Sequence, residues 1–154
     1  AMTKVFLDTN IFLEIFLEYF EQRREHRAVS RQLSAVEDGK LKAIISVGCV
    51  YTLTYLIRME LKRKEIHRPE QTMQLRATLD TVMSMVAVGG LSQKRVTHAI
   101  NDTAFDDVED SLQYQCALQS KCDAFITINL RDYRNADTAN MEIMSPTEFV
   151  EKYL

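Results

Sequence analysis

The stretch Lys4-Val5-Phe6-Leu7-Asp8-Thr9-Asn10 decides how the rest of the chain is interpreted. Its apolar residues are typical of a buried β-strand, and this strand ends at a carboxylate, Asp8. A helix-type pattern of apolar residues begins at Ile11, so the acid lies between a strand and a helix. Open α/β sheets keep their functional sites at the carboxyl ends of the strands. Asp8 is therefore a candidate site residue, although an acid in this position can equally well cap the helix that follows.

The composition favours one globular domain. The chain has 154 residues, of which 46% are hydrophobic and 27% charged, and we expect a single domain over residues 2–154. No apolar run is long enough to span a bilayer and no signal peptide is visible, so we expect no contact with a membrane. Three cysteines without a Cys-x-x-Cys pair favour a reduced, cytoplasmic protein. Because the net charge is -3, any contact with RNA must be local.

Strand and helix patterns alternate along the chain. Further strands are expected at 42–46, 85–88, 124–127 and 141–144, and helices at 10–19, 28–38, 47–64, 69–83, 92–101 and 108–120. A last helix opens with Ser145-Pro146-Thr147-Glu148, which is an N-cap serine, a proline at the first helical position and a glutamate three residues on. Parallel neighbours need crossover connections, so the alternation predicts an α/β fold: a three-layer α/β/α arrangement with a central parallel sheet of about five strands.

Several polar segments converge if the sheet is parallel. The ends of the strands at 4–7 and 124–127 can then be neighbours, which brings Asp8 to the same edge as the turn Thr127-Ile128-Asn129-Leu130-Arg131-Asp132. The helix at 108–120 begins within a run of four carboxylates, and its first turn can face the same edge. We therefore expect acids from three segments to gather at one place.

The run of carboxylates at 106–110 has both a structural and a chemical interpretation. We assign Asp106 as the N-cap and Glu109 as its capping-box partner, since acids are favoured at helix N-termini. Asp107 and Asp110 remain, and they share a face because they are three residues apart. Two carboxylates on one face repel one another unless a cation lies between them. A few carboxylates with water suit Mg²⁺ or Mn²⁺.

Such a site suits phosphodiester hydrolysis, in which the metal polarises the phosphoryl group and lowers the pKa of an attacking water. The sequence has no Gly-rich phosphate loop, no Gly-x-Ser-x-Gly and no Cys/His pair that could supply a nucleophile. A metal-bound water is therefore the expected nucleophile.

In their order and spacing, these segments resemble the PIN-domain nucleases, small α/β proteins that include the toxin of many bacterial toxin-antitoxin pairs. The resemblance covers nearly the whole chain. It implies a PIN-like fold and metal-dependent cleavage of single-stranded RNA, often by a dimer that binds an antitoxin protein. The segments that carry it are Val5-Phe6-Leu7-Asp8-Thr9-Asn10, Ala43-Ile44-Ile45-Ser46, Glu109-Asp110-Ser111-Leu112-Gln113 followed by Ala117-Leu118, Cys122-Asp123-Ala124-Phe125-Ile126-Thr127, and Ser145-Pro146-Thr147-Glu148-Phe149.

Position by position, the first acid of the family corresponds to Asp8 and the third to Asp110. The second, a glutamate, should fall at 50–53, where the sequence has no carboxylate, and the fourth corresponds to Asn129. The chain more closely resembles a branch with a Thr-x-Asn-x-x-Asp arrangement and no glutamate in the second helix. The acids expected to act in catalysis are Asp8, Asp110, Asp107 and Asp132. The expected metal ligands are these four and Asn129, with Thr9, Asn10 and Thr127 close by.

Two surface questions remain open from the sequence. Arg131 is the best candidate for an RNA phosphate contact, and Arg58 and Arg63 belong to a basic stretch that is either a solvated face or part of an RNA groove. Tyr51 and Tyr55 could stack on bases or pack in the core. The helices at 10–19 and 47–56 are apolar on more than one face, which fits core packing with or without a subunit or antitoxin contact.

Two other functions stay open as well. A non-catalytic module of the same fold that binds RNA or protein is consistent with the two missing acids. In a receiver-type or phosphoryl-transfer domain, Asp8 would be the residue that becomes phosphorylated. Haloacid-dehalogenase-type enzymes, however, have a second aspartate where this chain has Asn10.

Overall fold

A computed structural model describes residues 3–16 and 25–154, and the predicted end of the first helix at Tyr19 lies outside them. The elements, in chain order, are β1 (Thr3–Leu7), α1 (Thr9–Phe16), α2 (His26–Glu37), β2 (Leu41–Ser46), α3 (Val47–Arg63), α4 (Glu70–Met83), β3 (Val86–Gly89), α5 (Gln93–Asn101), α6 (Val108–Gln119), β4 (Ala124–Ile126), the 3₁₀ helix η1 (Leu130–Tyr133), β5 (Glu142–Met144) and α7 (Pro146–Tyr153).

The strands form one parallel sheet in the order β3-β2-β1-β4-β5. β1 lies in the middle, where Val5 pairs with Ala43 of β2 on one side and with Ala124 of β4 on the other. The chain builds β2 and β3 on one side of β1 and then crosses back to build β4 and β5 on the other. The order therefore reverses between β1 and β4, which is where open α/β sheets place their ligand sites.

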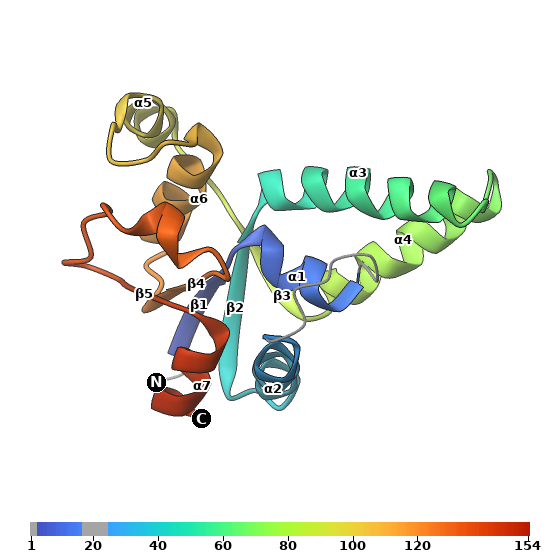
Figure 1. The fold of residues 1–154 in the computed structure, drawn as a ribbon, viewed down its shortest axis with the longest axis horizontal. Helices are drawn as coiled ribbons and strands as arrows, with labels where there is room; N and C mark the ends of the chain where they lie inside the picture. The colour runs from blue at the N-terminus through green and yellow to red at the C-terminus, as the bar shows by residue number, and fades with distance from the viewer. Residues whose placement is uncertain (1–2, 17–24) are drawn as a thin grey trace.

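Alternate side chains of the strands enter two cores, one on each face of the sheet. Val5 and Leu7 of β1 pack with residues of α1, α2, α3 and α7. Phe6 points to the opposite face, where it packs with Phe125 of β4 and with α6. The period of two along each strand thus separates the two helical layers, which confirms the predicted three-layer α/β/α fold (Figure 1).

The helix ends follow local sequence signals. The Ser145 side chain accepts a hydrogen bond from the Glu148 N–H at 3.1 Å, as the capping sequence predicts. Gly39, with φ of 75°, follows α2 in the left-handed conformation that glycine adopts without a steric penalty. Ser46 caps α3 in the same way, since its hydroxyl accepts from the Cys49 N–H at 3.0 Å.

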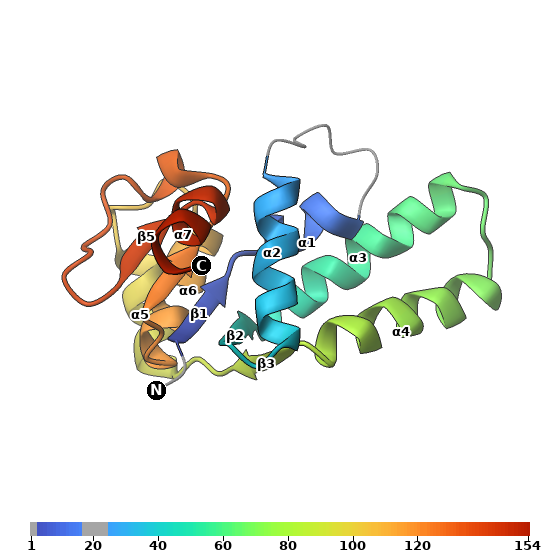
Figure 2. The same cartoon turned by 90° about the horizontal axis from the view of Figure 1, so that it is seen from below.

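α3 and α4 lie side by side and extend away from the sheet as a helical hairpin (Figures 1 and 2). Tyr51 and Tyr55 lie on the outer face of α3, with 74% and 53% of their surfaces exposed. Of the two roles left open for these tyrosines, the structure excludes the core. Within the described ranges, every helix is too short or too polar to cross a membrane.

Candidate active site

Asp8 lies at the carboxyl end of β1, in the middle of the sheet edge. Its backbone N–H donates to the carbonyl of Ile126 at 3.0 Å, so the acid continues the pairing of β1 with β4. The residue is 94% buried because α1 starts at Thr9 and because β4 and α6 lie close on either side. Two elements distant in sequence thus enclose the carboxylate, as the parallel arrangement of β1 and β4 predicts.

Both oxygens of the Asp8 carboxylate accept hydrogen bonds. Oδ1 accepts from the Thr9 N–H at 2.9 Å and from Nε2 of Gln113 at 3.2 Å. Oδ2 accepts from Oγ1 of Thr127 at 2.9 Å and from the Tyr133 hydroxyl at 3.0 Å. These donors come from α1, α6, η1 and the residue that follows β4, so the orientation of Asp8 is fixed by four separate segments.

Tyr133 connects the two principal acids. Its hydroxyl oxygen is 3.0 Å from Oδ2 of Asp8 and 3.2 Å from Oδ1 of Asp110. A phenol has a single proton, so it can donate to only one of them at a time. Burial, together with the charges of both acids, raises the pKa of Tyr133 far above its ordinary value, and the side chain stays a neutral donor.

Asp110 experiences the field of the other acids. Burial raises its pKa to about 7, and the charges of Asp8, Asp107 and Asp132 contribute, while the bond from Tyr133 partly offsets the rise. No lysine, arginine or histidine in the described part of the chain forms an ion pair with any of these four acids. The structure therefore brings the four predicted catalytic acids into one cluster whose negative charge favours a cation.

The capping assignment at α6 is wrong by one residue. The N-cap is Asp107, whose Oδ1 accepts from the Glu109 N–H at 2.8 Å, while Asp106 is exposed and lies 3.8 Å from Arg134. α6 itself starts at Val108, as predicted, so only the residue that caps it differs from the prediction. Asp107 thus combines a capping role with proximity to Asp110.

The other predicted polar residues arrange the loop after β4. Oγ1 of Thr127 accepts from the backbone N–H of Asn129 at 3.1 Å and from Nδ2 of Asn10 at 3.2 Å. Oδ1 of Asn10 in turn accepts from the Ile128 N–H at 3.2 Å. Asn129 and Asp132 are exposed around η1. Asn10 and Thr127 therefore hold this loop against Asp8, and the side chains of Asn129 and Asp132 remain accessible at its surface.

The acids of this cluster lie near enough for their charges to interact, but they do not form a ready-made metal site. In the residues that the structure describes, no three carboxylate, cysteine or histidine side chains stand close enough to share a metal ion. Tyr133 lies between Asp8 and Asp110 instead. α3 supplies no acid to this edge, since Glu60 lies near the far end of the helix and is paired with Arg63.

Three residues that contribute to the site were not predicted as site residues from the sequence: Tyr133, Gln113 and Ser46. Gln113 bonds Asp8 and also accepts a short hydrogen bond from the Ser46 hydroxyl. Gln113 lies three residues after Asp110, so helical spacing could have indicated it. Ser46 ends β2, the neighbour of β1, so its position at a strand end could also have indicated it. No comparable signal existed for Tyr133, because tertiary packing alone brings it to Asp8.

An apolar hollow adjoins the acid cluster. It has a volume of about 390 Å³ and lies between the start of α3 and the helices α5 and α6. Ser46, Glu109 and Gln113 form its polar border toward Asp8, and its walls are mainly aliphatic. The hollow can therefore hold an apolar or aromatic group beside the carboxylates.

The candidate RNA contacts occupy different settings. Arg131 is exposed on η1, next to the cluster. The Arg58 guanidinium carbon lies 6.0 Å from the centre of the Tyr55 ring, on the projecting hairpin. Arg63 binds the buried Glu60 through two hydrogen bonds, so its guanidinium is already engaged.

Comparison with known families finds one that covers most of the chain. The model of a family described as the PIN domain matches residues 4–131, which include β1, Asp8, Asp110 and the loop up to Arg131. The chain belongs to the PIN-domain family. The match confirms the resemblance carried by the sequence segments, and Asp132 lies just beyond its end.

Proteins similar to this PIN-domain chain include one named as a ribonuclease and, in fold, solved chains of VapBC complexes. The chain is 23% identical to ribonuclease VapC1 of Aquifex aeolicus (strain VF5) over 97% of its own length and 95% of that protein. Its fold is similar to a chain of VapBC2 from Rickettsia felis bound to promoter DNA (TM-score 0.64, 14% identity, 93% of this chain and 98% of the other). It is also similar to a chain of DNA-bound VapBC from Salmonella typhimurium (TM-score 0.60, 16% identity, 94% and 99% covered).

Proposed function

We propose that this PIN-domain protein is a metal-dependent endoribonuclease that cleaves single-stranded RNA. The observation that carries the proposal is the pair Asp8 and Asp110 at the point where the strand order reverses, bridged by Tyr133 and surrounded by further acids without a cationic partner. The similarity to ribonuclease VapC1 supports it.

The donor set fits Mg²⁺ or Mn²⁺, which bind carboxylate and amide oxygens. Asp8 and Asp110 would hold the ion, with Asp107, Asn129 and Asp132 as further oxygen ligands. The raised pKa of Asp110 fits the same role, because mutual repulsion among the acids falls when a cation neutralises them. When bound, the ion would polarise the phosphoryl group and lower the pKa of the attacking water.

The protein's own residues would position the reacting groups. The donors to Asp8 keep its carboxylate fixed, and Thr9, Asn10 and Thr127 hold the two loops that frame it. Exposed Arg131 would contact a phosphate of the strand. The adjoining apolar hollow would accept a base next to the cleaved bond, which a single strand can offer more readily than a duplex.

Purified protein incubated with matched single-stranded RNA, double-stranded RNA and single-stranded DNA tests the proposal. Each substrate is incubated with Mn²⁺, with Mg²⁺ and with EDTA, at protein in excess. Internal cleavage of single-stranded RNA with either metal and none with EDTA is expected. Intact RNA under every metal condition would refute the proposal.

The second candidate is a module that binds RNA or protein without cleavage. It is favoured by the neutral Asn129 and by the lack of a carboxylate from α3 at the acid edge. The same experiment separates the two, since binding in a gel-shift assay together with intact RNA identifies the non-catalytic module.

We also propose that the protein is the toxin of a toxin-antitoxin pair, a single PIN-like domain over 2–154 that acts in the cytoplasm. The fold similarity to VapBC complexes supports an antitoxin partner. The exposed face of α3 with Tyr51 and Tyr55 would serve contact with that partner or with a second copy in a homodimer.

A further inference from the structure

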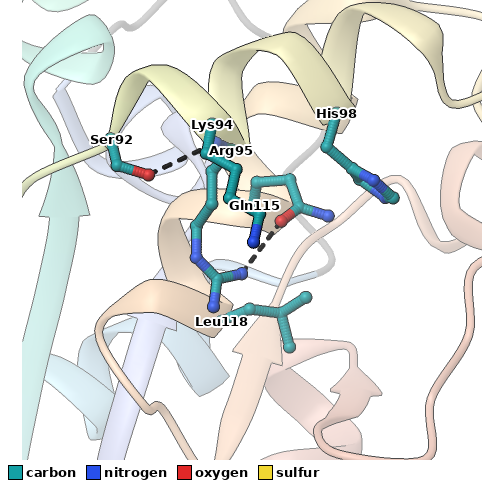
Figure 3. Close-up of a pocket in the computed structure, with 6 residues that line it drawn as sticks. All are labelled: Ser92, Lys94, Arg95, His98, Gln115 and Leu118. Carbon is teal, nitrogen blue, oxygen red and sulfur yellow. Dashed lines mark hydrogen bonds between the residues drawn. The ribbon is translucent and has the colours of Figure 1, made fainter.

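A second hollow lies between α5 and α6 (Figure 3). Its volume is about 400 Å³, and its lining differs from that of the hollow beside Asp8 because it is basic. Lys94, Arg95 and His98 come from one side of α5, and Gln115 and Leu118 come from α6. Figure 3 shows the side chains of Lys94 and Arg95 extending from α5 toward α6, with Arg95 bonded to Gln115.

No acid lines this hollow within the described residues. Of the basic side chains that line it, His98 has an acidic neighbour: Oδ2 of Asp102 lies 3.9 Å from Nε2 of His98. Lys94 and Arg95 form no ion pair with a described residue. Two positive side chains thus line the same hollow without an ion-pair partner among the described residues, which favours an external anion.

The hollow also contains a buried polar side chain, Gln115, which bonds one of the two cations. It is 94% buried, and its Oε1 accepts a hydrogen bond from Nη1 of Arg95 at 3.0 Å. This bond fixes the guanidinium while its other N–H groups make no bond to the described residues. A fixed guanidinium presents several donors in one plane, the arrangement that binds phosphate oxygens in pairs.

The geometry points to a phosphate-binding site: we propose that Lys94, Arg95 and the Gln115 amide bind one backbone phosphate of the RNA strand. The proposal rests on the proposed function for the identity of the strand, and it adds an anchoring point outside the acid cluster. Asp110 and Gln115 are five residues apart on α6, or about 7.5 Å along the helix axis. Five residues also place the two side chains about 140° apart around α6, so a strand of a few nucleotides that contacts both places has to pass around the helix.

The test measures binding of a short fluorescent single-stranded RNA by anisotropy in EDTA, so that no cleavage is required. The wild type is compared with a Lys94→Gln/Arg95→Gln double variant over about 0.05 to 1 M salt. Loss of one phosphate contact should reduce the slope of log K against log salt by about one, which makes the variant about tenfold weaker near 0.1 M and nearly equal to the wild type near 1 M.

An Arg31→Gln/Lys40→Gln variant is the matched control. It removes the same charge, but both residues border a hollow before β2, at the opposite edge of the sheet. Its salt slope should equal that of the wild type. An equal loss in both double variants, or none in either, would overturn the proposal, and thermal unfolding verifies that each variant is folded.

A second readout identifies the ligand at the site. In wild-type protein, the NMR signal of the Gln115 side-chain amide should shift when the RNA is added. A shift caused by inorganic phosphate or AMP but not by RNA would assign the hollow to a small phosphate and overturn the proposal. Because every measurement is made without metal, failure of RNA cleavage and failure of this site remain distinguishable.

Discussion

The raised pKa of Asp110 makes its contribution to the stability of the protein depend on pH. Its pKa rises from an ordinary 3.8 to about 7, so the folded protein retains a proton that the unfolded chain has lost between these two pH values. The contribution of Asp110 to the free energy of unfolding must therefore fall as pH rises from about 4 to about 7. Asparagine cannot ionise, so the free energy of unfolding of a protein with Asn at this position does not fall for this reason as pH rises.

We expect metal-free Asp110→Asn to be more stable than the wild type at pH 8 by about 1–2 kcal/mol, after allowance for solvent screening. The difference should vanish below about pH 4. Urea unfolding in EDTA at several pH values measures it. Asp106→Asn is the control because Asp106 lies outside the acid cluster. A difference that does not depend on pH would contradict the account.

Tyr133 should set the pH at which the site becomes active. Its bond to Asp110 lowers the pKa of that acid, and Tyr133→Phe removes the bond while keeping the ring. The pKa of Asp110 should then rise above about 7, and the midpoint of RNA cleavage on the pH–rate profile should move to higher pH, since metal binding needs the ionised carboxylate.

Tyr114→Phe is the matched control for that substitution. Its hydroxyl donates to the backbone carbonyl of Asp137 at 2.5 Å, and its ring packs in the same aromatic cluster. The midpoint of this variant should equal that of the wild type. A shift of similar size in both variants would show that packing, not the bond to Asp110, sets the profile.

Among the elements, those with strong local signals were predicted well from the sequence. The apolar run before Asp8 gave β1, and Ser145 with Pro146 gave the start of α7. The α6 cap was predicted one residue too early, because Asp106 and Asp107 are both suitable N-cap residues just before Val108. Local sequence patterns therefore located the helices and strands, but they did not identify which of two adjacent residues caps α6.

The cap of α7 offers a test at this scale. Ser145→Ala removes the acceptor of the Glu148 N–H, so the free energy of unfolding should fall by about 1 kcal/mol. Chemical denaturation measures the change. Ser30→Ala is the control, since Ser30 is exposed within α2, and it should alter stability by less than about 0.5 kcal/mol. Equal losses in the two variants would contradict the capping role.

Across the whole molecule, the order of the strands creates the site. Asp8, Asp110 and the loop after β4 are distant in sequence, and they meet because β1 and β4 are neighbours. The sequence alone predicted this meeting through the alternation of strands and helices. It could not predict Tyr133 as a bridge, because that contact leaves no periodic signal. Gln113 was missed as a donor to Asp8, although it lies one helical turn after Asp110.

The central claim is that the acids at this edge cleave RNA, and one matched pair of variants tests it most directly. Asp110 and Asp106 belong to the same run of acids, but only Asp110 bonds Tyr133 within the cluster. Metal-dependent cleavage of single-stranded RNA is compared for the wild type, Asp110→Asn and Asp106→Asn, with Asp8→Asn as a second cluster variant. We predict that Asp110→Asn and Asp8→Asn lose at least about a hundredfold in rate, and that Asp106→Asn cleaves like the wild type. Equal cleavage by all four proteins would contradict the account.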